Sequence, residues 1–117
     1  MDLNWEQVTV DAREPGALGG WWGEALGWVV VGDHPDEFEI RPDADRLPGI
    51  LFVRVADEKV GKNRLHLDFR PNNQDAEVSR LLGLGATLVD IGQGESSWVV
   101  LCDPEGNEFC VLGSSAR

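Results

Sequence analysis

The succession of predicted elements occurs twice along the chain, and this internal repeat restricts the possible folds more than any other feature. In residues 6–55 and again in residues 64–112, hydrophobic alternation and turn residues predict a strand, a helix and three further strands. Each predicted helix stops at a Leu-Gly corner, Leu26-Gly27 in the first half and Leu84-Gly85 in the second. The sequence therefore predicts two copies of one βαβββ module.

An apolar stripe at helical spacing predicts the first helix: Leu18, Trp21, Trp22, Ala25 and Leu26. Three glycines within this segment lower its intrinsic helix propensity, so tertiary packing must hold it. The tryptophans of the stripe and Trp28 after it are assigned to the core. Trp5 and Trp98 lie nearer strand ends, where an indole ring can stack on a ligand.

Polar and apolar residues alternate in the first strand of each half. Gln7, Thr9 and Asp11 alternate with valines in the predicted strand Glu6–Asp11, and His66, Asp68 and Arg70 alternate with apolar residues in the second half. The apolar faces are expected to pack on the helices, which leaves the polar faces on the other side of each sheet. Strand parity also places Phe52, Arg54 and Cys110 on this polar side, with Trp98 at its rim. The candidate ligand-binding residues are Gln7, Thr9, Phe52, Arg54, Trp98 and Cys110.

His66 and Asp68 are the catalytic candidates. They are two residues apart on one strand face, roughly 6.5 Å between Cα atoms at the rise of a strand. A histidine beside a carboxylate can exchange a proton near neutral pH, which makes His66 a candidate general acid or base. The alternative is a histidine that is only hydrogen-bonded to Asp68 or Gln7, with no catalytic role.

The charge of the chain excludes one class of partner. With 117 residues and a formal net charge of −11, this predicted single domain repels phosphate backbones, so nucleic acid is not an expected partner. The same field favours a cationic small molecule, although an acidic surface also serves solubility alone. No apolar run approaches the ~18 residues of a membrane span, and residues 1–6 show no secretory signal. We therefore expect a cytoplasmic protein without a membrane partner.

The two cysteines flank the last predicted turn. They are too few for a disulfide framework and lack the spacing of a zinc site, so free thiols are expected. If Cys102 pairs with residue 109 across the hairpin, Cys110 points to the opposite face. Cys110 would be a nucleophile only if His66 or Arg54 lowered its pKa; otherwise it is a small apolar residue within a strand.

Four segments carry a resemblance to a known family: Val8–Asp11 with Glu14-Pro15, the corner Trp21–Trp28, the stretch Lys62–Asp68 and the turn Asp103–Asn107. On these segments the chain resembles the vicinal oxygen chelate superfamily of glyoxalases, bleomycin-resistance proteins and extradiol dioxygenases, and within it the small glyoxalase-like branch. The resemblance covers residues 3 to 113. It implies an α+β fold in one domain, 1–117, with modules 3–56 and 63–113 forming a curved mixed sheet around a central cleft, and a homodimer.

The resemblance also implies where a metal would bind. The metal enzymes of the family carry ligands on the first and last strands of each module, typically His, Glu, His and Glu. The corresponding positions here are Gln7, Phe52 (or Val53 after a shift of one residue), His66 and Cys110. Because a divalent metal ion needs three or four anionic or imidazole ligands and only His66 is of the expected type, no metal and no other cofactor is predicted.

The sequence therefore predicts a glyoxalase-like protein that binds a small aromatic or cationic molecule in its cleft without a metal. One alternative is a glyoxalase-like lyase or isomerase, or a dioxygenase-type enzyme, that uses His66 with or without a divalent metal. Another is a dimerising structural or regulatory module with no ligand. The substrate is not predicted, because this fold hosts many chemistries.

Overall fold

The computed structural model describes residues 2, 4–61, 66–90 and 97–115. The chain forms two compact units, Met1–Glu58 (unit 1) and Lys59–Arg117 (unit 2), and each is described by itself. Their boundary falls in the connection expected between modules 3–56 and 63–113. Neither of the helices described is long and apolar enough to cross a membrane.

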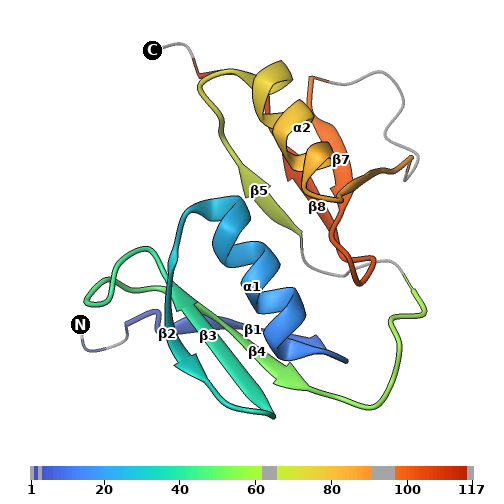
Figure 1. Ribbon diagram of the computed structural model, residues 1–117. Helices are drawn as coiled ribbons and strands as arrows, with labels where there is room; N and C mark the ends of the chain where they lie inside the picture. Colours follow the sequence, from blue (N-terminus) through green and yellow to red (C-terminus); the bar gives the residue numbers. More distant parts are fainter. Residues whose placement is uncertain (1, 3, 62–65, 91–96, 116–117) are drawn as a thin grey trace. The chain divides into compact units, whose positions relative to one another are not determined.

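Unit 1 contains β1 (Gln7–Ala12), α1 (Pro15–Leu26), β2 (Val29–Asp33), β3 (Glu37–Arg41) and β4 (Gly49–Arg54). The strands form one sheet in the order β1-β4-β3-β2 (Figure 1). β1 runs parallel to β4, and the other neighbours are antiparallel. This is the predicted βαβββ module, with β1 shifted by one residue from the expected Glu6–Asp11.

The glycines of α1 have a packing role that their low helix propensity hides. A Cβ atom added to Gly19 would collide with the ring of Phe38, and one added to Gly23 would lie 3.6 Å from Ile40. The helix therefore lies close against β3, as Figure 1 also shows. It ends at Gly27, whose φ of 67° is left-handed and suits glycine. The large buried side chains of this core are Leu18, Trp22, Phe38, Ile40, Ile50 and Phe52.

Unit 2 contains β5 (Leu67–Phe69), α2 (Gln74–Gly83), β6 (Thr87–Leu88), β7 (Val99–Cys102) and β8 (Glu108–Val111). Its sheet has the order β5-β8-β7-β6, with β5 parallel to β8, and so repeats the connectivity of unit 1. The predicted α+β fold of two βαβββ modules is confirmed. The sequence also predicts strands over Arg64–Phe69 and Ala86–Ile91, and their end residues Arg64 and Ile91 lie outside the described part of the chain.

Capping and side-chain hydrogen bonds fix the start of α2. The Asn73 side chain accepts a hydrogen bond from the Ala76 amide at 3.0 Å, the usual role of asparagine at a helix N-cap. The Gln74 side-chain amide donates to the carbonyls of Ser97 and Val111 at 2.8 and 3.1 Å. One glutamine thus ties the helix start to the chain before β7 and to the last residue of β8.

The tryptophans divide differently from the prediction. Trp22 is buried as expected, but its T-shaped neighbour Trp21 is only half-buried, and so is Trp28. Trp5 and Trp98 are exposed, as their positions near strand ends suggested. The assignment of three tryptophans to the core is therefore fully met at Trp22 alone.

Candidate functional site

The polar face of unit 1 lies opposite the helix. In the parallel pairing of β1 with β4, Thr9 is the partner of Leu51 and Asp11 the partner of Val53, and partner residues point to the same face. Glu39 of β3 also pairs with Leu51 and therefore lies on the same face. Gln7 is half-buried and Thr9 is exposed. This face therefore carries the polar residues expected from β1, interspersed with aliphatic side chains of β4.

Phe52 does not lie on that face, and its predicted placement is wrong. It pairs with Val10 of β1 and with Phe38 of β3, so it points toward α1, and it is 0% exposed. Arg54 has the same parity, because it pairs with the buried Ala12, although it is exposed at the strand end. The run Ile50–Val53 is apolar on both faces and gives no alternation to fix its parity, which explains the error. Leu51 and Val53 take the places on the polar face.

The corresponding face of unit 2 brings several titratable side chains together. Asp68 of β5 pairs with Cys110 of β8, so the two point the same way. His66 is half-buried and lies just before β5, outside the strand, so the pairing assigns its side chain to neither face. Glu108, two residues before Cys110, is on this face too. The register therefore groups Asp68 with Cys110 as predicted, and Glu108 is a further member of the face that the prediction missed. The pairing does not include His66, which was expected within the strand.

Cys110 is held as a neutral thiol. It is 7% exposed, and burial raises its pKa; the negative charge of Asp68 and a hydrogen bond with that carboxylate raise it further. A nucleophilic cysteine needs the opposite shift, since the thiolate is the reactive form. The structure therefore favours the apolar interpretation of Cys110 over the nucleophile.

The hairpin register differs by one residue from the prediction. Cys102 pairs with Glu108 and not with residue 109, while Val100 pairs with Cys110. Both cysteines consequently lie on the same face, which corrects the expectation of opposite faces. Both are free. Burial is the main cause that raises the pKa of Cys102, followed by the charges of Glu108 and Asp103, with Lys59 acting in the other direction.

Glu108 is a buried carboxylate with a cation beside it. The Lys59 ammonium lies 3.2 Å from Oε1 and 3.1 Å from Oε2, with 8% of the Glu108 side chain exposed. A buried charge is tolerated only with a partner of this kind. Glu108 stands two residues before Cys110, so alternation within one strand places both on the same face once β8 is known to begin at Glu108.

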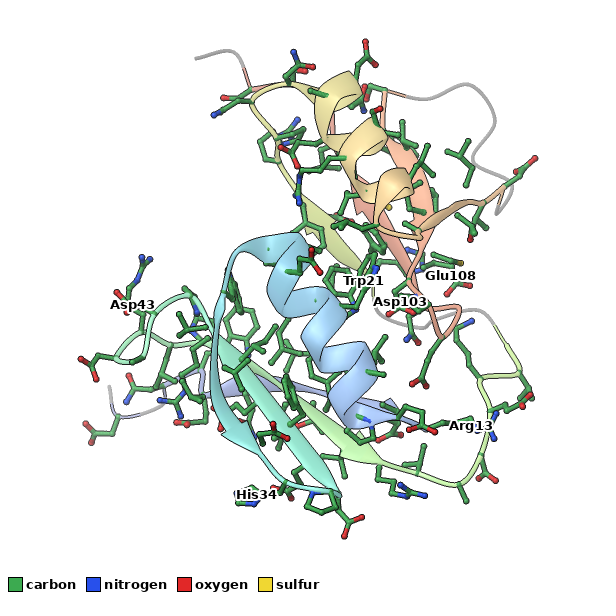
Figure 2. All side chains as sticks on the ribbon, viewed as in Figure 1. Arg13, Trp21, His34, Asp43, Asp103 and Glu108 are labelled. Carbon is green, nitrogen blue, oxygen red and sulfur yellow. The ribbon has the colours of Figure 1, made fainter. Side chains whose placement is uncertain are left out.

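The turn Asp103–Asn107 is closed by the Asp103 side chain, which is buried at 4% exposure (Figure 2). Its Oδ1 accepts hydrogen bonds from the backbone amides of Glu105 and Asn107 at 2.9 and 3.0 Å, and the Asn107 side-chain amide donates to both carboxylate oxygens. Gly106 has a φ of 85°, a conformation that favours glycine. The motif that carries the family resemblance is therefore a structural turn that sets the register of β7 and β8.

Comparison with known proteins now identifies the family. The sequence pattern described as "Glyoxalase-like domain" matches residues 7–112, nearly the whole chain. The chain belongs to the glyoxalase-like domain family. Among curated proteins no sequence match was found. Family membership confirms the predicted resemblance, and it leaves the substrate open.

Solved structures show the same fold at low sequence identity. A glyoxalase/bleomycin resistance protein/dioxygenase family enzyme from Burkholderia phytofirmans PsJN has a TM-score of 0.74 at 19% identity, over 93% of this chain and 97% of its own. Fosfomycin resistance protein FosX from Mesorhizobium loti has a TM-score of 0.70 at 11% identity (99% and 95% covered). Oxidase ChaP-H2 has a TM-score of 0.68 at 15% identity (98% and 96%).

The metal site that the resemblance implies does not fit the residues present. Of the four corresponding positions, Phe52 has no donor atom and points into the core of unit 1, and Val53 on the other face has none either. Cys110 is a thiol with a raised pKa, and Gln7 is a weak neutral donor. Within residues 2, 4–61, 66–90 and 97–115, no group of three or more His, Cys, Asp or Glu could hold a metal ion.

Proposed function

We propose that this glyoxalase-like domain binds a small aromatic or cationic molecule on the polar faces of its sheets, without a metal. The observation that carries the proposal is the set of side chains at the four positions corresponding to metal ligands. Only His66 retains a strong donor there, while the faces themselves keep polar groups and aliphatic contacts. Such a mixture of apolar surface with a few polar groups is typical of small-molecule sites.

The charge of these faces supports a cationic ligand. Asp68 and Glu108 lie on the face of unit 2, and Asp11, Glu37 and Glu39 have the parity of the polar face of unit 1. The basic partners nearby only partly offset them: Arg41 bonds Glu39 at 2.8 Å, and Lys59 bonds Glu108. With a net charge of −11 over the whole chain, a cation gains from both the local and the long-range field.

Thermal unfolding with a matched set of probes tests this proposal. The probes are aromatic ammonium compounds, with aromatic carboxylates of the same size as controls. We expect the cationic set to raise the midpoint of the wild type, since a ligand that binds only the folded state stabilises it. D68N should reduce the shift, whereas D45N, in an exposed loop, should leave it unchanged. Equal shifts with both probe sets would contradict a cationic ligand, and no shift with any probe would contradict the whole proposal.

A second candidate function is a lyase or isomerase reaction that uses His66. It is favoured by the short separation of His66 and Asp68, two residues apart at the start of β5, where a histidine and a carboxylate could exchange a proton. Turnover of an α-keto aldehyde–thiol adduct, lost in H66Q but kept in H34Q, would support it. Turnover that H66Q leaves intact would exclude this role for His66. His34 is an exposed turn residue and serves as the matched control (Figure 2).

We also propose that the protein is a cytoplasmic homodimer with no nucleic-acid partner. The homodimer rests on the family resemblance alone, and the absence of nucleic acid rests on the charge. Light scattering coupled to size-exclusion chromatography measures the mass directly. A mass of one chain, 12.9 kDa, at all concentrations would exclude the dimer.

A further inference from the structure

The junction between the two units lies between adjacent residues of opposite charge, and each is bound to its own unit. Unit 1 ends at Glu58 and unit 2 begins at Lys59. Glu58 Oε1 lies 2.6 Å from Nη1 of Arg13, which precedes α1. Lys59 Nζ lies 3.1 Å from Oε2 of Glu108, the first residue of β8. Both ion pairs join residues far apart in sequence, so both fix the path of the chain.

Side-chain contacts contribute much of what holds the chain at the junction. Val55, just after β4, donates its amide hydrogen to the Ala12 carbonyl at 2.8 Å, which continues the pairing with β1. Beyond that residue the chain is exposed from position 56 to position 61. Lys59 also donates to the Gly61 carbonyl, so its ammonium holds its own turn as well as Glu108.

We propose that two ion pairs hold the chain at the junction, and we call them together the ionic pin. Glu58 attaches the chain to unit 1 through Arg13, and Lys59 attaches it to unit 2 through Glu108. Each ion pair then restricts the backbone on its own side of the junction.

The two halves of the pin differ in burial, so salt acts on them unequally. The Arg13 and Glu58 side chains are 53% and 70% exposed, whereas those of Lys59 and Glu108 are 23% and 8% exposed. Exposed ion pairs are weak and screened by salt, whereas buried pairs are screened much less. Loss of Lys59 would also leave Glu108 as a buried charge without this partner. Rising ionic strength should therefore release the unit 1 half first.

Limited proteolysis of the full chain measures each half separately. Trypsin cleaves after Lys59 and a glutamate-specific protease after Glu58, and mass spectrometry identifies the fragments. We expect E108Q to speed cleavage after Lys59 by roughly tenfold, since a part-buried pair protects its lysine. R13M should speed cleavage after Glu58 by no more than about threefold, because that pair is exposed. In the wild type, about 0.5 M NaCl should reproduce the R13M effect but hardly change cleavage after Lys59.

Cleavage after Arg80, within α2, reports whether unit 2 stays folded in each variant. If E108Q unfolds unit 2, cleavage after Arg80 will accelerate together with cleavage after Lys59. E108D, which keeps the charge on a shorter side chain, is then tested in its place. Faster cleavage after Lys59 with Arg80 protected supports the pin in either variant. Cleavage after Lys59 at the wild-type rate in the folded variant, or equal salt sensitivity at Glu58 and Lys59, would overturn it.

Discussion

Replacing Asp103 with alanine should destabilise the protein strongly, because this carboxylate closes the turn between β7 and β8. It accepts hydrogen bonds from the amides of Glu105 and Asn107 and from the Asn107 side chain at 2.9–3.1 Å, and it is buried. A hydrogen bond to a charged group contributes about 1.5–3 kcal/mol. Glu105 and Asn107 are half-buried, so water recovers part of the loss. We therefore expect a loss of about 2–4 kcal/mol, less than the sum of the separate bonds.

Urea unfolding followed by tryptophan fluorescence measures this loss. With a slope of about 2 kcal/mol per molar urea, the midpoint should fall by about 1–2 M. The matched control is D43A, because Asp43 is exposed and accepts a local bond from the Ala44 amide at 2.8 Å (Figure 2). D43A should cost less than about 1 kcal/mol. If D103A fails to fold, D103N, which keeps one carbonyl acceptor, should still lose more than D43A. Equal losses at the two positions would refute the structural role of Asp103.

Three further predictions follow from packing and ionisation. G19A should destabilise the protein, because the added Cβ would collide with Phe38. In G20A the added Cβ meets nothing within 4 Å, so this variant should be neutral or stabilised by up to about 1 kcal/mol. Equal urea midpoints for the two variants would contradict the packing of α1. F52A should cost about 3–5 kcal/mol, as for a core phenylalanine, and a loss below about 1 kcal/mol would contradict its burial under α1. Because the pKa of Cys110 is raised in the fold, the neutral thiol contributes stability that is fully present below the unfolded value of about 8.5 and is lost as the pH rises through the folded value. The urea midpoint should therefore fall less at alkaline pH in C110A than in the wild type. An equal fall in both proteins would contradict the raised pKa of Cys110.

Alternation of side chains in the strands predicted most of what the structure shows. In β1 the sequence Gln7–Asp11 alternates in polarity, so the side facing α1 could be assigned without coordinates. In β4 both faces are apolar, and Phe52 was assigned to the wrong one. Only the pairing of Phe52 with Val10 determines its direction. A strand without polar alternation carries no parity signal in its own sequence.

The hairpin register and the helix glycines depended on contacts that a sequence does not display. The Asp103 side chain and the bond from the Asp103 amide to the Asn107 carbonyl close the turn so that Cys102 pairs with Glu108. That single residue of register places both cysteines on one face, and the start of β8 at Glu108 adds this residue to the candidate site. Gly19 looked like a weakness of α1, yet it permits the close approach of the helix to Phe38.

The number of divalent metal ions bound per chain tests the central claim most directly. The protein should be purified without chelator and measured by elemental analysis, with nickel, zinc, iron and manganese supplied during expression. Because Gln7, Phe52 and Cys110 stand at three of the four corresponding positions, we predict far less than one ion per chain for each metal. One tightly held ion per chain, lost in H66Q and kept in H34Q, would contradict a metal-independent site.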